Sequence, residues 1–139
     1  MTNGHLPAIE QLTPEQSWDL LAETTVGRLA IRQGSGVDLF PINYLTHEHK
    51  IYFRSGPGTK LIELTDEPDV AFEADGRDGH HQWSVVIRGI ATRLDTDTEI
   101  IDSGVKTLKS WYPDGKFNYV RIDAATIVGR RFLPHFLGD

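Results

Sequence analysis

One stretch of the chain decides its fold: Val26-Gly27-Arg28-Leu29-Ala30-Ile31-Arg32, then Gln33-Gly34-Ser35-Gly36, then Val37–Leu45. In the first segment Leu29 and Ile31 alternate with their neighbours, which is the period of two that a half-buried strand shows. The glycine-rich tetrapeptide supplies turn residues, and a second strand-like run follows it. The stretch therefore predicts an antiparallel β-hairpin.

Four more strand-like runs lie downstream of this hairpin. They cover Ile51–Arg54, Val70–Asp75, about Gln82–Leu94, and Phe117 to about Arg131, the last interrupted near Asp123-Ala124-Ala125. The connections between neighbouring runs are too short for parallel crossovers, so the strands are expected to be antiparallel. Six strands of this kind predict a mainly β protein with a closed barrel. Several runs are apolar on both faces, so the outer face of the barrel is expected to meet a helix or another subunit.

Three helices are expected between or beside these strands. The first begins at Thr13, where Thr13 and Gln16 form a capping box, and ends by Gly27. A short second helix is expected at Thr59–Leu64. The third starts at a second capping box of Thr96 and Glu99 and buries one face made of Ile101, Val105, Leu108 and Tyr112.

Composition limits the class of protein. The chain has 139 residues, which suits a single domain spanning residues 1–139, and it contains no cysteine for a disulfide or a thiolate metal site. Its net charge of −6 argues against a nucleic-acid partner. No apolar run is long enough for a membrane span, and the N-terminus lacks the pattern of a signal peptide. We therefore expect a cytoplasmic protein without a membrane partner.

The segment Phe53-Arg54-Ser55-Gly56-Pro57-Gly58-Thr59-Lys60-Leu61 is the best candidate for a binding site. A strand ends in a basic residue, a glycine-rich bend follows, and a helix opens with a hydroxyl and a second cation. Backbone N–H groups at a helix start, together with two cations, suit a phosphate. The spacing is equally compatible with a capped helix and two solvated cations, and it is not that of a P-loop.

Other candidate residues have simple structural alternatives. Phe40-Pro41-Ile42-Asn43-Tyr44 offers polar contacts for a flat heterocycle, although Phe40 and Tyr44 also suit a core. Trp83, beside Ser84, lines a groove or packs in the interior. The carboxylates of Glu73 and Asp75 share one strand face, where they are solvated or pair with Arg88 or Arg93. The six histidines are scattered and are expected to bind no metal.

Taken together, five segments resemble the pyridoxamine 5′-phosphate oxidase-like superfamily of FMN-binding split barrels. They are Val26–Ala30, Phe40–Tyr44, Phe53–Leu61, Val70–Asp75 and Trp83–Gly89, and they occur in the order that the superfamily shows. The resemblance covers roughly Glu15 to Phe132 and is nearest to short actinobacterial members similar to nitroimidazole-resistance proteins. It implies a six-stranded antiparallel Greek-key split barrel that forms a homodimer with FMN in each interface groove.

The resemblance also implies roles for individual residues. Arg54, Ser55, Thr59 and Lys60 would hold the FMN phosphate, and Phe53 would lie near the ribityl chain. Phe40, Ile42, Asn43 and Tyr44 would run beside the isoalloxazine, largely through their main chain. Trp83 and Ser84 stand where the family presents a polar contact from the long strand, although the larger oxidases have glutamine at the position of Ser84.

The expected function is that of an FMN-dependent oxidoreductase or reductase acting on a small molecule, with nitroaromatic compounds as the candidate class of acceptor. No side chain is assigned a catalytic role, because the flavin carries the electron chemistry. The arginine-bearing segment with which true oxidases hold the substrate phosphate is not recognisable in Gly129–Asp139, so pyridoxamine 5′-phosphate is not the expected substrate. Two alternatives remain open: the same fold with the deazaflavin F420, and a protein that binds flavin or haem without turnover.

Overall fold

The computed structural model describes residues 9–56, 69–108 and 118–133, and the structural statements below refer to these residues. The elements are β1 (Ile9–Leu12), α1 (Pro14–Leu21), β2 (Val26–Gln33), β3 (Gly36–His47), β4 (Lys50–Ser55), β5 (Asp69–Asp78), β6 (His81–Arg93), α2 (Asp97–Ser103), the 3₁₀ turn η2 (Val105–Thr107) and β7 (Asn118–Phe132).

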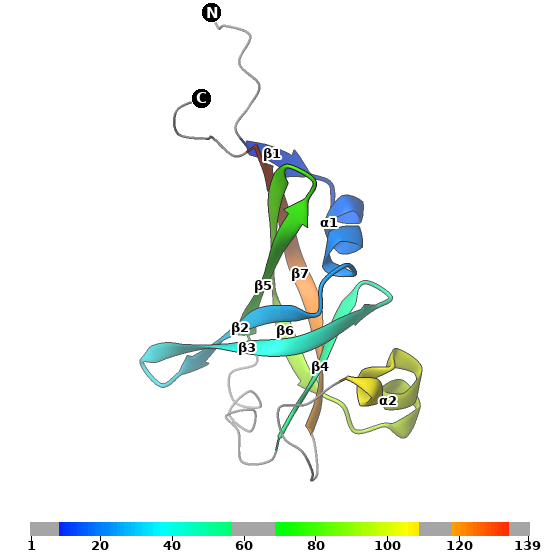
Figure 1. Ribbon diagram of the computed structural model, residues 1–139. Coiled ribbons are helices and arrows are strands. Elements are labelled where there is room, and N and C mark those ends of the chain that lie inside the picture. The colour runs from blue at the N-terminus through cyan, green and yellow to red at the C-terminus, as the bar shows by residue number, and fades with distance from the viewer. Residues whose placement is uncertain (1–8, 57–68, 109–117, 134–139) are drawn as a thin grey trace, which may run out of the picture.

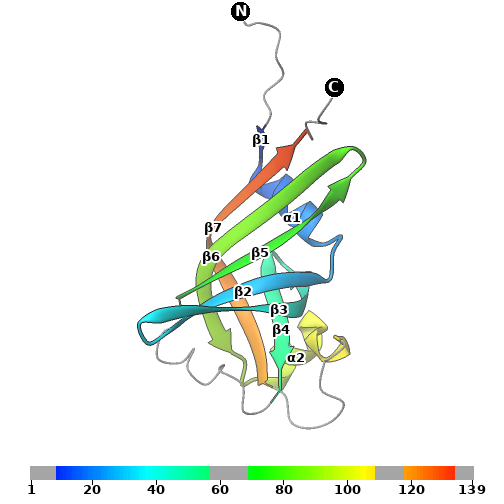
Figure 2. The same ribbon diagram turned by 60° about the vertical axis from the view of Figure 1, so that its left-hand side comes forward.

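The described strands form one antiparallel sheet of seven strands in the order β1-β7-β4-β3-β2-β5-β6 (Figure 1). Strand β6 also pairs with β7, so the six strands β2 to β7 make a closed cycle of hydrogen-bonded neighbours. Within it β5 returns to lie beside β2, and the spatial order β5-β2-β3-β4 is that of a Greek key. Turned by 60°, the long strands β6 and β7 run side by side along the molecule (Figure 2).

The expectation of a mainly β, antiparallel protein is confirmed. Each of the six predicted strands is present, with ends that differ by a few residues at most. The seventh strand, β1, was not expected. It has four residues that are mostly exposed, and it is a strand because it pairs with the end of β7. Such an edge strand leaves little trace in the sequence, since pairing and not burial defines it.

The interior of the strand cycle holds the main hydrophobic core. Alternate residues point inward, among them Leu29 and Ile31 of β2, Phe72 of β5 and Ile87 of β6, all with 2% exposure or less. The expected interruption in the last strand is a β-bulge, since Arg88 pairs with Thr126 whereas Gly89 pairs with Ala124. A Cβ on Gly89 would lie 2.0 Å from the Asp123 carbonyl oxygen, so the bulge needs glycine there.

Helix α1 begins as the sequence predicts. Gln16 N donates to Thr13 Oγ1 at 3.1 Å, and Thr13 N donates to Gln16 Oε1 at 2.8 Å, which completes the capping box. The helix ends at Leu21, earlier than expected, because the chain must turn before β2 starts at Val26. It packs on β7, where a Cβ on Gly129 would collide with Ser17 Oγ.

The prediction for the third helix was wrong in two respects. Thr96 caps α2 without a side-chain hydrogen bond, because the Glu99 carboxylate is bound by other partners described below. The helix ends at Ser103, since Gly104 adopts a left-handed conformation (φ 81°), so the buried face contains Ile100 and leaves Ile101 64% exposed. The described residues contain two α-helices and one 3₁₀ turn, and the helix expected at Thr59–Leu64 lies outside them.

Candidate functional site

Arg54 and Asn43 lie on the outer face of neighbouring strands. Strands β3 and β4 are joined by a turn, and their last registered pair is Tyr44 with Phe53, both in the core. Asn43 and Arg54 are the next residues along each strand, so alternation directs both side chains outward. Both side chains are half-buried, so they are neither fully solvated nor enclosed.

The Arg54 guanidinium is oriented by the 3₁₀ turn η2. Its Nη1 donates to the Lys106 carbonyl at 3.3 Å, which joins the end of β4 to the segment after α2. Ser55 follows Arg54 and donates to the Gly56 carbonyl at 3.4 Å. Thr59 and Lys60, the other residues expected at a phosphate, lie outside the described residues. A guanidinium and a neighbouring hydroxyl are a donor set that fits a phosphate group.

Four of the expected flavin contacts belong mainly to the core. Ile42, Tyr44 and Phe53 are buried in the main cluster, and Phe40 packs partly against it. The Tyr44 hydroxyl donates to the Leu21 carbonyl at 2.6 Å and also bonds Thr24 Oγ1. Burial raises the pKa of Tyr44 to about 12. These side chains hold α1 and β3 together, so only their main chain is placed to meet a ligand outside the strand cycle.

Trp83 and Ser84 point to opposite sides of β6. Trp83 is 2% exposed and packs in the core against Gly76, so its side chain has the packing role that the sequence left open. Ser84 points outward and pairs with Asp75 of β5 and Arg130 of β7. Ser84 therefore shares the outer face with Asn43, although on a different part of the sheet.

An ion-paired cluster lies on the outer face of β2 and β5. Arg28 Nε lies 3.1 Å from Glu73 Oε1, and Arg28 Nη2 pairs with Asp75. The sequence-based partners for these carboxylates, Arg88 and Arg93, were wrong, because the antiparallel register sets Arg28 directly opposite Glu73. Burial, and then the adjacent Asp75, raise the pKa of Glu73 to about 7, whereas a hydrogen bond from Glu73 lowers the pKa of Asp75.

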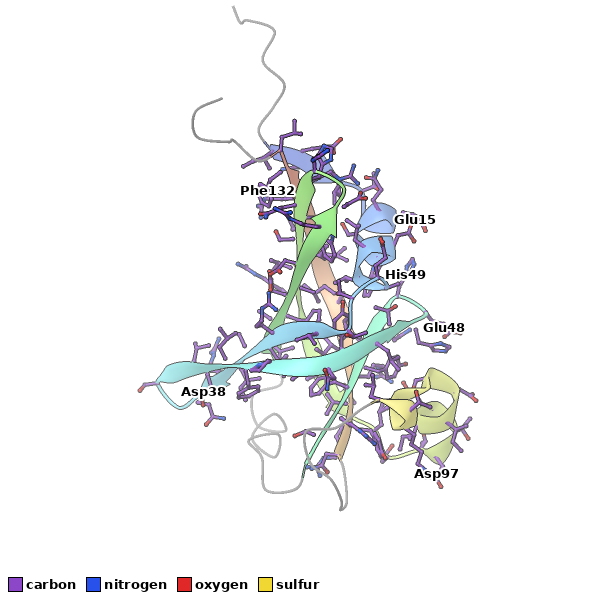
Figure 3. The ribbon with its side chains drawn as sticks, in the orientation of Figure 1. Glu15, Asp38, Glu48, His49, Asp97 and Phe132 are labelled. Atoms are coloured by element: carbon purple, nitrogen blue, oxygen red, sulfur yellow. The ribbon has the colours of Figure 1, made fainter. Side chains whose placement is uncertain are left out.

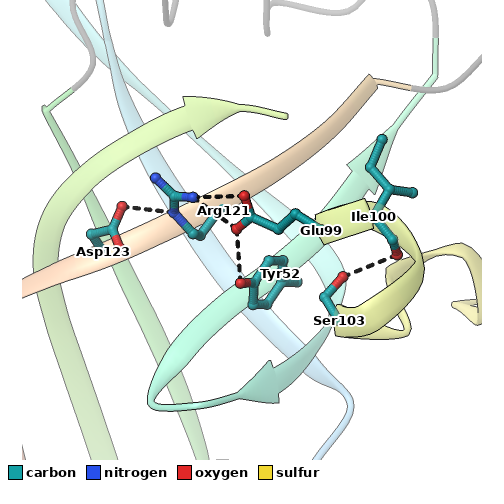
Figure 4. A network of polar contacts seen from close by, with 6 residues as sticks. All are labelled: Tyr52, Glu99, Ile100, Ser103, Arg121 and Asp123. Atoms are coloured by element: carbon teal, nitrogen blue, oxygen red, sulfur yellow. Dashed lines mark hydrogen bonds and ion pairs between the residues drawn. The ribbon is translucent and has the colours of Figure 1, made fainter. Parts of the chain in front are cut away.

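A second polar network joins α2 to strands β4 and β7, and the sequence reasoning missed it (Figure 4). Arg121 Nη1 of β7 donates to both Glu99 carboxylate oxygens, at 2.9 and 2.7 Å, and its Nε donates to Asp123 at 2.8 Å. The Tyr52 hydroxyl donates to Glu99 Oε2 at 3.0 Å. The sequence feature that could have indicated this network was Arg121, a single cation that lies between the buried Val120 and Ile122 and faces outward.

Large apolar side chains are exposed on the outside of the sheet. Val37 and Leu39 of β3 are 70% and 67% exposed, and Ile90 of β6 and Val128 of β7 are 48% and 39% exposed. The β2–β3 hairpin carries the first two and projects from the body of the molecule in both ribbon views. In Figure 3 the labelled Asp38 marks this hairpin, on the opposite side from Asp97 of α2.

The described residues contain no group of three or more His, Asp or Glu side chains arranged to hold a metal ion. His49 instead stacks on Trp18 with ring centroids 5.2 Å apart, which joins the β3–β4 turn to α1. None of the helices in the described segments has the length and apolarity needed to cross a membrane.

Comparison with known proteins extends these observations. The family model described as pyridoxamine 5′-phosphate oxidase matches residues 13–131. A crystal structure of a Corynebacterium glutamicum protein, provisionally named a pyridoxamine 5′-phosphate oxidase, is 34% identical, with a TM-score of 0.80 over 91% of this chain and 99% of that one. An FAD-binding protein of Mycobacterium smegmatis is 30% identical, with a TM-score of 0.78 over 91% of this chain and 100% of that one.

A curated but uncharacterised protein of Mycobacterium tuberculosis is 33% identical over 82 residues, which are 59% of this chain and 74% of that protein. The family match spans both the strand cycle and the outer face that carries Asn43 and Arg54. The resemblance noted from the sequence is thereby confirmed: the chain belongs to the pyridoxamine 5′-phosphate oxidase family.

Proposed function

We propose that this protein binds FMN and is a flavin-dependent oxidoreductase acting on a small molecule. The observation that carries the proposal is Arg54, directed outward at the end of β4 and fixed by the Lys106 carbonyl, in a chain of this family. The relative from Mycobacterium smegmatis is an FAD-binding protein, which supports a flavin as the cofactor. FMN, when bound, supplies the electron chemistry, and the chain supplies position and electrostatics.

The proposed contacts follow from the faces of β3 and β4. Arg54 and Ser55, with Thr59 and Lys60, bind the phosphate through charge-assisted hydrogen bonds. Asn43 lies on the same outer face as Arg54 and donates or accepts a hydrogen bond at the polar edge of the flavin ring. Phe40, Ile42, Tyr44 and Phe53 contribute mainly their backbone, because their side chains are needed in the core.

The proposed binding groove lies between two copies of the chain, with the strand cycle as the split barrel of each. Support comes from Val37 and Leu39, which are 70% and 67% exposed on a projecting hairpin. Exposed apolar side chains gathered on one sheet face are typical of an interface. A two-fold dimer would cover this face in both copies at once.

The first experiment is the absorbance spectrum of the freshly purified protein, which separates a flavin from a deazaflavin such as F420, from haem and from no chromophore. Titration with FMN, FAD and riboflavin, followed by flavin fluorescence, then identifies the form that the pocket prefers. Reduction by a nicotinamide donor, with and without a nitroaromatic acceptor, separates an enzyme from a protein that only binds its cofactor. A colourless protein that binds none of these flavins would overturn the proposal.

Arg54→Gln tests the phosphate contact. We expect it to weaken FMN binding roughly 10–100-fold, because a charge-assisted hydrogen bond contributes about 1.5–3 kcal/mol, and to leave riboflavin binding unchanged. Lys60→Ala should act in the same direction. Arg77→Gln on β5 is the matched control, since Arg77 is an exposed arginine outside the β2–β3 hairpin. Equal weakening of FMN and riboflavin by Arg54→Gln would show a structural effect and refute the assignment.

A further inference from the structure

The segment from α2 to η2 is attached to the outer face of β4 and β7 by two kinds of contact. Ile100 and Val105 pack with Tyr52 and Leu94 in a small second hydrophobic cluster. This cluster adjoins a polar network through Tyr52, because Glu99 accepts hydrogen bonds from both Arg121 and Tyr52 (Figure 4). The packing is apolar and adaptable, whereas the polar contacts have defined directions, so Glu99 fixes where the segment sits along the strands.

The same segment then contacts Arg54. Lys106, seven positions after Glu99, presents its carbonyl to Arg54 Nη1 at 3.3 Å. Tyr52 and Arg54 are two residues apart on β4 and share its outer face, so Glu99 and Lys106 contact successive outward residues of one strand. The two ends of the segment are therefore held against β4, one through a carboxylate and the other through a carbonyl.

We infer that Glu99 is a positioning residue for the phosphate site, acting through the α2–η2 segment on the Arg54 guanidinium. This inference rests on the proposed function. A guanidinium is a planar fork, and its orientation decides whether it meets a phosphate with two parallel hydrogen bonds or with one. The Lys106 carbonyl sets that orientation, and the Arg121–Glu99–Tyr52 contacts keep the carbonyl in place.

The electrostatics of the network suit this role. The hydrogen bond from Arg121 lowers the pKa of Glu99, so the carboxylate stays ionised at neutral pH. Burial, and then Glu99, raise the pKa of Tyr52 to about 12, so its hydroxyl keeps the proton that it donates. Arg121 is shared between Glu99 and Asp123 and offsets part of the charge of Glu99, which weakens the repulsion between this carboxylate and an anion at the site.

Glu99→Gln gives a test in which two explanations predict opposite signs. Removing a negative charge near the site would by itself strengthen the binding of a phosphate. Loss of the ion pair with Arg121 loosens the segment, and we expect FMN binding to weaken about tenfold, equivalent to about 1.4 kcal/mol. Riboflavin, which has no phosphate, should bind within about twofold of the wild type. The measurement is titration of the variant with each flavin by fluorescence quenching.

Asp102→Asn is the matched control, since Asp102 is an exposed carboxylate on the same helix. It should leave FMN binding unchanged or slightly stronger. Unchanged or stronger FMN binding in Glu99→Gln would overturn the inference, and so would equal weakening of FMN and riboflavin, which marks a structural effect. Tyr52→Phe keeps the buried ring and removes one hydrogen bond, so it should weaken FMN selectively but less.

The variants also separate this inference from the proposed function. Wild-type protein that binds FMN no better than riboflavin, or an Arg54→Gln variant without selective loss of FMN, refutes the phosphate site, and the inference falls with it. Selective loss in Arg54→Gln without any in Glu99→Gln refutes the inference alone. If the Glu99→Gln variant does not fold, Tyr52→Phe tests the inference by the same criterion, which is weaker binding of FMN with unchanged binding of riboflavin.

Discussion

At the scale of single residues, burial, Asp75 and Arg28 together set the pKa of Glu73. Glu73 pairs with Arg28 from the neighbouring strand and stands two residues from Asp75 on one face of β5. Burial disfavours its charged form, and the nearby Asp75 adds to this, so the pKa of Glu73 rises to about 7 although Arg28 opposes the shift. The cluster therefore keeps a proton through the weakly acidic range, and that proton is shared with an ionised Asp75.

We expect this proton to make stability depend on pH in an unusual direction for a carboxyl group. The folded protein binds the Glu73 proton more tightly than the unfolded chain, in which the pKa of this carboxyl is near its ordinary value of 4.5. Between that value and about 7 the free energy of unfolding should fall as pH rises. Glu73→Gln should remove this part of the slope, as measured by urea denaturation across the range.

Two other carboxyl groups, those of Glu15 and Asp75, serve as comparisons for that prediction. Glu15→Gln changes an exposed carboxyl on α1 and should leave the pH profile as in the wild type. Asp75 contributes in the opposite sense, because its pKa is lowered, and its contribution to stability is lost as pH falls below the ordinary aspartate pKa of 3.8. A Glu73→Gln profile parallel to the wild type from pH 4.5 to 7 would show that another group is responsible.

At the scale of elements, the β3–β4 turn has an unfavourable sequence for its geometry. Glu48 and His49 both adopt positive φ, 50° and 57°, a conformation that favours glycine and asparagine. At His49 this unfavourable conformation is accompanied by a stabilising contact, because the His49 ring stacks on Trp18 of α1. Glu48 makes no such ring contact among the described residues, and its Oε1 lies 3.9 Å from His47 Nε2.

We therefore expect Glu48→Asn to stabilise the protein, by about 0.5–1 kcal/mol, because asparagine tolerates the left-handed conformation. The urea midpoint should rise without a change in slope. Glu48→Ala is the control, since alanine keeps the conformational cost and should give no comparable gain. An asparagine variant no more stable than the alanine variant would contradict this account of the turn.

At the scale of the whole molecule, the projecting β2–β3 hairpin carries large apolar side chains that a single copy of the chain leaves exposed to solvent. If it forms the proposed dimer interface, a charge in place of Leu39 must be buried without a partner. We expect Leu39→Asp to weaken the dimer by at least about 100-fold and to reduce FMN binding with it. Sedimentation at micromolar concentration and flavin titration measure the two effects.

The matched control is Ile101→Asp, because Ile101 is 64% exposed and belongs to α2, which lies on the other side of the molecule from the hairpin in Figure 1. It should leave association unchanged. A wild-type protein that sediments as a monomer throughout the micromolar range would remove the interface groove from the proposal.

Much of the architecture follows from local chemistry in the sequence. The hairpin at Val26–Leu45 was predictable because alternation and a glycine-rich turn act over a few residues. The capping box of α1 and the irregularity near Asp123-Ala124-Ala125 were predictable for the same reason. Proline and capping residues restrict the backbone, and glycine permits turn conformations, wherever they occur, so their effect does not depend on distant parts of the chain.

The sequence by itself determined six of the seven described strands, their antiparallel pairing and the family, and with it the candidates Asn43 and Arg54. The tertiary structure alone decided which partners the charged groups take: Arg28 for Glu73 and Asp75, and Arg121 with Tyr52 for Glu99. It also assigned Trp83 and Tyr44 to the core. The physical reason is that ion pairs and burial depend on the register between strands far apart in the chain, which the local pattern of side chains does not encode.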